Sequence, residues 1–346
     1  MRFTEFSGEW ELKSIEHIAP LQRGFDLPKQ NINPGCVPIV YSNGILGTHS
    51  EGKCIGPGVV TGRSGTIGKL TYVESGPYWP HNTSLWVTNF YGNHEKFVYY
   101  LYQHIGIEQY ASGSGVPTLN RNDVHRHIAA VPCIDEQRKI ASMLSLIDEL
   151  IAVQSKIIEE QETLLRSLRH KIYSRVQAQS QCTIADVLCY EQPTKYLVTD
   201  TDYTDDDSQV PVLTANKAFI LGYTTENFGI YDKGPCIILD DFTLDCKYVD
   251  FKFKVKSSAI KILRAKAKTN LRFIFEYFRF LELNTTEHRR HYIAEIEPMS
   301  ILLPSNEEID RIARLFTALD ERLETARKEL KILESQKMYM LQKMFI

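Results

Sequence analysis

Two segments of 42 residues decide the fold, and they repeat one another. Residues 132–173 read PCIDEQRKIASMLSLIDELIAVQSKIIEEQETLLRSLRHKIY, and residues 304–345 read PSNEEIDRIARLFTALDERLETARKELKILESQKMYMLQKMF. The two align without a gap at an offset of 172 residues. Each begins with proline, has acidic residues in its first turn and ends with basic residues, the charge order that a helix dipole favours. The sequence therefore predicts two long, matching helices.

The least polar positions of both segments recur at alternating steps of four and three residues. These positions are Ile140, Leu144, Ile147, Ile151, Gln154, Ile158, Gln161, Leu165, Leu168 and Ile172 in the first segment, and Ile312, Phe316, Leu319, Leu323, Ala326, Leu330, Leu333, Lys337, Met340 and Met344 in the second. A period of 3.5 residues is the seam of a coiled coil. Helices of globular proteins average about 11 residues, so the lengths disfavour two ordinary core helices. We expect the two seams to pair antiparallel within the chain.

The regions before the two helices echo each other more faintly. Gly56-Pro57 corresponds to Gly234-Pro235, and Phe97-Val98-Tyr99 to Phe273-Ile274-Phe275. An internal repeat of this size reflects a repeated structural unit. We predict four parts: a first α/β unit 1–131, a central coiled-coil helix 132–176, a second α/β unit 177–303 and a C-terminal coiled-coil helix 304–346. The expected fold class is α/β (α+β) with a pseudo-two-fold repeat.

Short β-branched and apolar runs predict the strands of both units. These runs span residues 37–41, 58–61, 67–73, 83–88, 236–239, 247–255 and 259–263. In the run around residue 250, Val249, Phe251, Phe253 and Val255 alternate with polar residues, so Lys252, Lys254 and Lys256 are expected on a solvent-facing side. The aromatic stretches 97–102 and 273–280 follow helical spacing and are interpreted as core helices.

The composition is that of a folded, soluble chain, with 43% hydrophobic and 24% charged residues. No run of residues resembles a membrane helix or a signal peptide, and the seven cysteines show no zinc-ligand spacing. We therefore expect a cytoplasmic protein. The net charge of −3 conceals a segregation: residues 186–245 hold twelve acidic and three basic residues, and residues 247–290 hold twelve basic and four acidic ones. The basic block predicts an anion-binding face.

The clearest chemical pattern is the glycine-rich stretch Gly62–Lys69. It lacks the first glycine and the final hydroxyl of a nucleotide-triphosphate loop, where Arg63 and Leu70 stand instead. The stretch is compatible with contacts to a nucleic-acid phosphate or base edge, and equally with a plain glycine-rich hairpin. Asp240, Asp245 and Lys247 are compatible with a Mg²⁺-dependent nuclease, although such short matches arise easily by chance. No metal site and no nucleophile motif is identified.

Three stretches carry a resemblance to a known family. They are Trp10-Glu11-Leu12-Lys13-Ser14-Ile15, the glycine-rich stretch Gly62–Lys69, and the start of the first long helix, Val131–Ala141, with its Pro-x-x-x-Glu-Gln-x-x-Ile-Ala pattern. Together with the repeat, they resemble the specificity (S) subunit of type I restriction–modification systems. The second unit departs from the pattern, because residues 182–188 lack the tryptophan and Ile309 stands where glutamine is usual.

The resemblance implies a non-catalytic subunit that reads a bipartite DNA site. Its partners would be double-stranded DNA, two methyltransferase (M) subunits and motor-nuclease (R) subunits. No cofactor is expected on this chain, whereas S-adenosylmethionine, ATP and Mg²⁺ are expected on the partners. The alternative is a DNA-binding coiled-coil scaffold or regulator that has no modification partners.

Candidate DNA contacts are polar residues on glycine-rich or strand-edge loops, and basic residues suited to phosphates. In the first unit they are Asn43, Arg63, Ser64, Lys69, Asn82, Thr83, Ser114 and Thr118; in the second they are Lys217, Thr243, Lys247, Lys252, Lys254, Arg289 and Arg290.

Overall fold

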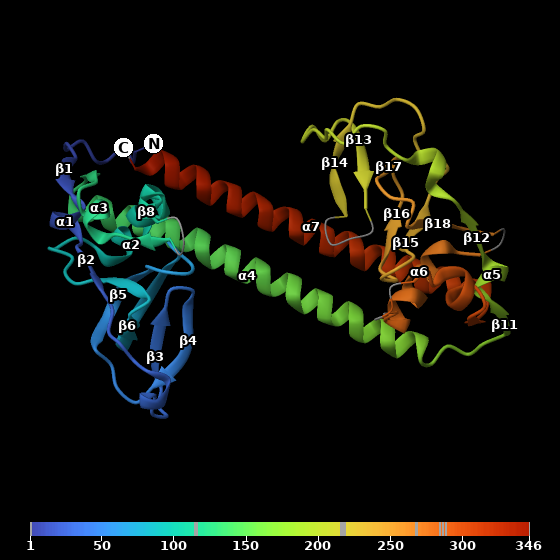
Figure 1. The fold of residues 1–346 in the computed structure, drawn as a ribbon, viewed down its shortest axis with the longest axis horizontal. Coiled ribbons are helices and arrows are strands. Elements are labelled where there is room, and N and C mark those ends of the chain that lie inside the picture. The colour runs from blue at the N-terminus through green and yellow to red at the C-terminus, as the bar shows by residue number, and fades with distance from the viewer. Residues whose placement is uncertain are drawn as a thin grey trace. The chain divides into compact units, whose positions relative to one another are not determined.

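The chain folds into two compact units (Figure 1). The structure is a computed structural model, and it describes residues 2–113, 117–214, 219–266, 269–283, 285, 287 and 289–345. Unit 1 comprises Met1–Ser155 and Lys328–Ile346, and unit 2 comprises Lys156–Arg327. Each unit therefore contains part of both long helices in addition to its own α/β part.

A six-stranded mixed sheet in the order β2-β7-β5-β6-β3-β4 is the centre of unit 1. Its strands are β2 (Leu21–Arg23), β3 (Val37–Tyr41), β4 (Gly44–His49), β5 (Cys54–Gly62), β6 (Leu70–Pro80) and β7 (Ser84–Val87). Neighbours are antiparallel except β3 and β6, which are parallel. The strand predicted at 67–73 begins later, at Leu70, because residues 63–69 form a loop.

Short elements surround this sheet. They are β1 (Glu11–Ser14), α1 (Ile15–Ile18), η1 (Lys29–Asn31), α2 (Glu95–Ile105), η2 (Ile107–Tyr110), β8 (Ala111–Ser112), β9 (Thr118–Leu119), α3 (Arg121–His125) and β10 (Ile128–Val131). Strand β1 pairs antiparallel with β10, so the two ends of the α/β part meet just before the first long helix.

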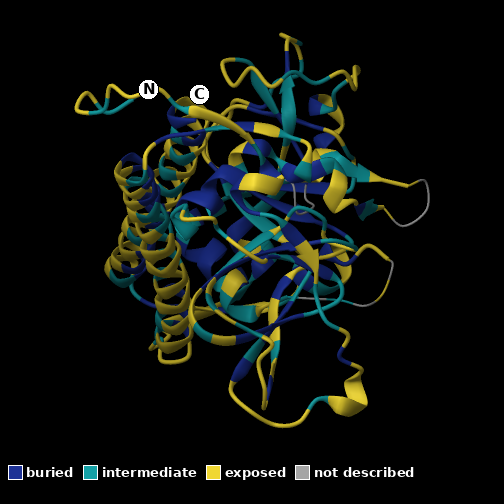
Figure 2. Ribbon diagram, turned by 90° about the vertical axis from the view of Figure 1, so that its left-hand side faces the viewer, coloured by how far each residue is buried: buried dark blue, intermediate teal, exposed yellow. Residues whose placement is uncertain are grey.

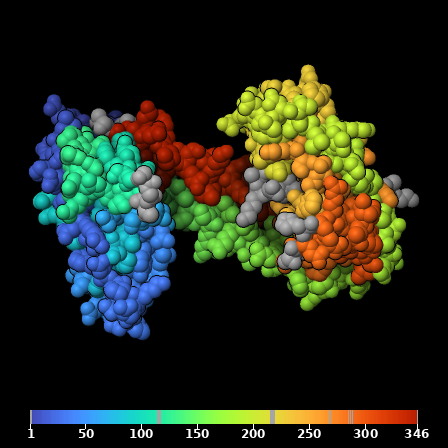
Figure 3. Space-filling view, in the orientation of Figure 1, coloured from blue at the N-terminus to red at the C-terminus, as the bar shows by residue number. Residues whose placement is uncertain are grey.

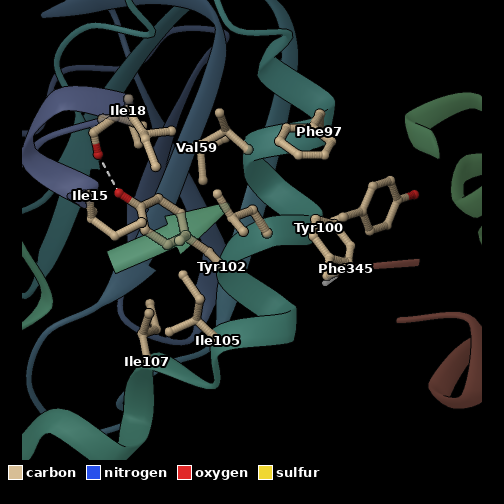
Figure 4. Close-up of a cluster of buried hydrophobic side chains, with 14 of the residues drawn as sticks. Ile15, Ile18, Val59, Phe97, Tyr100, Tyr102, Ile105, Ile107 and Phe345 are labelled. Carbon is tan, nitrogen blue, oxygen red and sulfur yellow. Dashed lines mark hydrogen bonds between the residues drawn. The ribbon is translucent and has the colours of Figure 1, made fainter. Parts of the chain in front are cut away.

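The core of unit 1 forms around α2, as expected from its aromatic residues (Figure 4). Phe97, Tyr100 and Tyr102 are fully buried. The Tyr102 hydroxyl donates a hydrogen bond to the Ala19 carbonyl, and Phe345, which follows the C-terminal long helix, packs on Phe97 with ring centroids 5.3 Å apart. The core therefore joins α2 to the end of the chain.

Unit 2 repeats this order of elements around two smaller sheets, β12-β18-β15-β16 and β14-β13-β17. Its elements are β11 (Ser180–Thr183), α5 (Ile184–Val187), β12 (Leu188–Glu191), η3 (Pro193–Tyr196), β13 (Val210–Leu213), β14 (Ile220–Thr224), β15 (Cys236–Asp240), β16 (Cys246–Val249), β17 (Lys254–Val255), β18 (Ile260–Ala265), α6 (Leu271–Leu281), η4 (Tyr292–Ile296) and β19 (Ser300–Leu303). Strands β11 and β19 pair as β1 and β10 do. The prediction of one strand over 247–255 is wrong, because residues 250–253 separate β16 from β17.

The two long helices are α4 (Ile134–Tyr173) and α7 (Asn306–Met344). Their predicted seam positions are buried or half-buried throughout, whereas most other positions are exposed (Figure 2). In unit 1, Ile140 and Leu144 share a core with Leu341 and Met344. The start of α4 therefore packs on the end of α7 in this unit.

Unit 2 has the reciprocal arrangement. Leu165 and Tyr173, near the end of α4, share a core with Ile312, Phe316 and Leu323, near the start of α7. The helices are consequently antiparallel within each unit, which is the pairing that the two matching seams predict. No helix among the described residues is long and apolar enough to cross a membrane.

One repeated aspartate of the long helices anchors α2 and α6. In unit 1, Asp148 accepts a hydrogen bond of 2.7 Å from the Tyr100 hydroxyl and pairs with Lys337 at 2.6 Å. Burial raises the pKa of Tyr100, so this hydroxyl stays protonated and remains a donor. In unit 2, Asp320 pairs with Arg272.

The anchor in unit 2 extends into a buried ionic cluster. Arg272 also contacts the fully buried Glu276 at 2.8 Å, and Arg169 of α4 contacts the same carboxylate at 2.7 Å. Because the carboxylate of Glu276 is paired on both oxygens, its burial is compensated. The cluster ties α6 to both long helices.

Truncation of a seam residue tests this packing. We expect Leu144→Ala to lower the free energy of unfolding by about 3 kcal/mol, because Leu144 is fully buried and the substitution leaves a cavity. The matched control is Leu146→Ala on the same helix, at a side chain that is 57% exposed; it should change stability by less than about 0.5 kcal/mol. Urea unfolding followed by circular dichroism measures both. Equal losses in the two variants would show that the seam does not stabilise unit 1.

Candidate nucleic-acid interface

Loops from four parts of unit 1 meet at one end of its sheet. The Arg63 amide donates to the Thr83 carbonyl at 2.9 Å, and the Leu119 amide donates to the Arg63 carbonyl at 2.8 Å. The Lys69 ammonium donates to the Asn43 carbonyl at 2.7 Å. We call this group of loops, residues 41–46, 62–69, 81–83 and 117–119, the loop cluster.

The loop cluster brings most of the sequence-predicted residues of unit 1 together. The predicted residues that lie in the loop cluster are Asn43, Arg63, Ser64, Lys69, Asn82, Thr83 and Thr118. Ser64 and Thr118 form a β-bridge, and Asn82 donates a hydrogen bond to Asp26. Ser114 lies outside the described residues.

The glycines of the 62–69 loop are required by its shape. A Cβ atom on Gly62 would lie 1.8 Å from the Thr66 carbonyl oxygen, which is too close for any side chain. Gly65 and Gly68 have φ values of +82° and +77°, which residues with a side chain rarely adopt. The loop is therefore a tight turn that presents Arg63 and Lys69 from fixed positions.

The polar groups of the loop cluster differ in how far they are engaged. Among the described residues, the Arg63 guanidinium forms no ion pair and the exposed Asn43 carboxamide has no hydrogen-bond partner. The Thr83 hydroxyl lies 3.0 Å from His81 Nδ1, and burial lowers the pKa of His81. His81 is consequently neutral near pH 7, and Arg63 and Lys69 supply the positive charge.

Sequence reasoning missed three residues of this cluster. Tyr41 packs on His81 with ring centroids 4.4 Å apart, and the Ser42 amide donates to the Thr83 hydroxyl at 3.3 Å. Asn43-Gly44 is a dipeptide typical of two-residue hairpin turns. In the structure Tyr41 pairs with Gly44, so Asn43 is the second residue of the two-residue turn between β3 and β4. That signal would have located the hairpin tip, although not its neighbours.

In unit 2 the candidate cations lie beside carboxylates. Lys247 pairs with Asp245 at 3.2 Å, Lys252 with Asp232 at 2.9 Å, and Arg289 with Glu295 at 2.5 Å. Arg290 and Thr243 lie at the β15–β16 turn, since Arg290 approaches Asp241 at 4.0 Å and the Thr243 amide donates to Asp240. Only part of this set is therefore brought together, and Lys217 lies outside the described residues.

Lys254 is not on the surface, which corrects the expectation of a solvent-facing side. Its side chain is fully buried, pairs with Glu226 and donates to the Phe228 carbonyl at 2.8 Å. Hydrogen bonds from Lys254 and Thr199 hold the pKa of Glu226 at about 2. The break before β17 turns Lys254 inward, so it belongs to the interior of unit 2.

The residues of the nuclease hypothesis have structural roles. Asp240 is nearly buried, and its carboxylate accepts hydrogen bonds from the amides of Phe242 and Thr243. Asp245 is engaged with Lys247. In the part of the chain that the structure describes, no three His, Cys, Asp or Glu side chains are grouped to hold a metal ion. The geometry does not support a nuclease site.

Comparisons with known proteins agree with this arrangement. Residues 7–163 match the family described as the type I restriction modification DNA specificity domain. A curated relative, the EcoR124I/EcoR124II type I restriction enzyme specificity subunit of Escherichia coli, is 42% identical over 156 residues, which are 40% of this chain and 38% of that protein. The chain thus aligns with well under half of the length of this relative.

Solved structures extend the likeness to the whole chain at the level of the fold. The S subunit of a type I restriction–modification system from M. genitalium has a TM-score of 0.73 at 16% identity, covering 100% of this chain and 99% of that one. A chain from a study of type I restriction–modification complex assembly has a TM-score of 0.55 at 12% identity, covering 98% of both. Residues 7–163 are therefore similar to the type I DNA specificity domain. The chain as a whole has the fold of a type I S subunit.

Paired substitutions separate the buried lysine from an exposed one. Lys254→Met leaves the Glu226 carboxylate without its cation in an almost buried site, so we expect a loss of about 3 kcal/mol in unfolding free energy. Lys252→Met removes an exposed ion pair and should change stability by less than about 1 kcal/mol. Under the DNA-binding role proposed below, Lys252→Met should instead lower the salt dependence of DNA binding by about one phosphate contact. Urea unfolding and salt-dependent anisotropy measure the two effects. A stable Lys254→Met protein would contradict the structural assignment.

Proposed function

We propose that this chain is the sequence-specific DNA-binding subunit that directs a type I restriction–modification system to a bipartite site. The observation that carries the proposal is the convergence of Asn43, Arg63, Ser64, Lys69, Thr83 and Thr118 in one loop cluster within a DNA specificity domain. The proposal assigns no catalytic step to this chain.

The loop cluster offers the two kinds of contact that sequence-specific binding needs. Arg63 and Lys69 supply positive charge for phosphates or for the acceptor edge of guanine, and Asn43 has the donor and acceptor pair that matches adenine. The glycine-rich turn carries Arg63 and Lys69, and the short β3–β4 turn carries Asn43, so no long loop is involved. Contacts of both kinds on one rigid surface favour readout of a short sequence.

Unit 2 supports a second, different readout. Thr243, Lys247 and Arg290 lie around the β15–β16 turn, and Lys252 and Arg289 add exposed cations elsewhere. The two units share an order of elements but differ in their loops. Two such readers in one chain are suited to two half-sites of different sequence.

The partners in this proposal are two M subunits and R subunits, which would carry S-adenosylmethionine, ATP and Mg²⁺, in the cytoplasm. The net charge of −3 supports a complex in which several subunits bind the DNA together. Contacts between cations and phosphates dominate DNA affinity, and this chain has no excess of cations to make them alone. Partner subunits would supply the remaining phosphate contacts.

Methylation-sensitive sequencing of host DNA tests the proposal. Deletion of the gene for this chain should remove methylation at one bipartite motif and leave all other modified motifs unchanged. Re-expression should restore that motif. An unchanged methylation pattern in a host with intact methyltransferase genes beside this one would favour the alternative of a DNA-binding scaffold.

Replacement of one recognition unit tests whether the two readers are independent. Exchange of residues 1–130 for the matching part of a relative should change one half of the methylated motif and leave the other half and the spacer intact. The reason is that the loop cluster is formed entirely within unit 1. The same sequencing measures the outcome, and a change in both halves would contradict independent reading.

The length of α4 and α7 is proposed to set the gap between half-sites. Four residues inserted after Gln154 and four after Ala326, close to where both helices pass from one unit to the other, add about 6 Å to each helix. At about 3.4 Å per base pair, the preferred spacer should grow by about two base pairs. The insertion exceeds one helical turn by about 40°, which a coiled coil absorbs by local unwinding.

A library of targets whose spacers differ by single base pairs measures this effect through methylation. Two base pairs rotate the far half-site by about 70°, so the added turn does not fully compensate and affinity should fall. An active variant that keeps the original spacer would show that the helices do not set the gap.

A further inference from the structure

Two aliphatic side chains are exposed at the edge of the sheet in unit 1. Ile45 and Leu46 lie on β4, the edge strand, with exposed fractions of 50% and 64%. The β3–β4 hairpin that carries them is part of the blue surface of unit 1 (Figure 3). Exposed aliphatic residues on an edge strand promote unwanted pairing, and proteins usually place charges there. Their position therefore calls for a function.

A β-bulge explains why both side chains are exposed. Val40 pairs with Ile45 and Ile39 with Gly47, so Leu46 is the extra residue of the bulge. A bulge interrupts the alternation of a strand and redirects its side chains. Adjacent residues that would otherwise face opposite sides are thus both accessible to a partner.

The pair lies directly beside the proposed DNA-reading groups. Asn43 is two residues before Ile45, and the Lys69 ammonium bonds to the Asn43 carbonyl. A Cβ atom on Gly44 would lie 3.8 Å from the Lys69 nitrogen, whereas one on Gly47 would meet nothing within 4 Å. The hairpin therefore carries the Asn43 carboxamide and two exposed aliphatic side chains, and the Lys69 ammonium from the neighbouring loop bonds to its tip.

We propose that Ile45 and Leu46 contact the C5 methyl group of a thymine in the half-site read by unit 1, while Asn43 reads the adenine paired with it. This inference rests on the proposed function. The thymine methyl is the apolar group that distinguishes A·T pairs in the major groove, and Asn is the amide that pairs bidentately with adenine N6 and N7. One hairpin thus carries the apolar side chains for the thymine and the amide for the adenine of the same base pair.

A DNA base fits this surface better than a protein subunit does. A stable protein interface buries about 800 Å² on each partner and has an apolar centre. Here Thr48 of β4 and Ser50, which follows the strand, are exposed close in sequence to the aliphatic pair. Two side chains with polar neighbours match the size of a methyl group and its base edge.

Duplexes that contain the methylated motif provide the test. Each thymine is replaced in turn by deoxyuridine, which removes the methyl group and preserves base pairing. The full-length chain, purified with whatever subunits accompany it, is titrated with each duplex by fluorescence anisotropy. We expect one substitution in the unit 1 half-site to weaken binding about threefold to fivefold, the size expected for one buried methyl group.

A double variant links that loss to the hairpin. Ile45→Ser with Leu46→Ser should bind thymine and deoxyuridine duplexes equally at that position. The matched control is Ile55→Ser on β5 of the same sheet, which removes an aliphatic side chain that is 80% exposed. Ile55 pairs with Pro77 of β6 and is not part of the loop cluster. This control should keep the full preference for thymine. Circular dichroism confirms that both variants are folded.

Three results would overturn the inference. They are a unit 1 half-site without any A·T pair, equal binding of all deoxyuridine duplexes by the unchanged protein, and a thymine preference that survives in the double variant. The third result together with loss of an accompanying subunit would identify the hairpin as a protein contact. Sequence-selective binding in any of these cases leaves the proposed function standing, whereas binding without sequence preference removes both.

Discussion

The pairing of one apolar seam with another is the interaction on which the structure depends. The seam of α4 meets the seam of α7 in each unit, and each α/β core is completed by residues from both helices. In unit 1, Phe345 packs on Phe97 just after the end of α7, so this end of α7 helps to close the core of unit 1. Unit 1 is built from two separate stretches of the chain, whereas unit 2 is one continuous stretch, and both units contain parts of α4 and α7.

The repeated aspartate shows how two different α/β parts are attached to the long helices. Asp148 accepts a hydrogen bond from the neutral Tyr100 hydroxyl of α2, whereas Asp320 pairs with Arg272 of the Arg272–Glu276–Arg169 cluster. A neutral contact loses little when it is altered, but removal of one charge from the cluster leaves another buried and unpaired, which costs several kcal/mol. The ionic residues that anchor α6 in unit 2 therefore depend on one another, because the loss of one charge leaves its partner unpaired.

The parts of the structure that could be predicted from the sequence are those set by local periodicity. The heptad steps identified α4 and α7, and the helical spacing of aromatic residues identified α2 and α6 as core helices. The loop cluster depends on strand order, because the parallel pairing of β3 with β6 brings residues 42 and 83 together. Lys254 was misplaced because its partner, Glu226, lies 28 residues earlier and no local pattern reports that contact.

The charges of the two units suggest a division between specificity and affinity under the proposed function. The exposed cations of unit 2 lie beside Asp245, Asp232 and Glu295, and these carboxylates reduce the attraction to any phosphate. Each phosphate contact changes the logarithmic salt dependence by about 0.9, so a surface with few unpaired cations binds random DNA weakly. A subunit of this kind gains from weak non-specific binding, because selectivity is the ratio of specific to non-specific affinity. The seam fixes the position of each α/β part within its unit, and the proposed contact residues lie mostly on the short loops between strands.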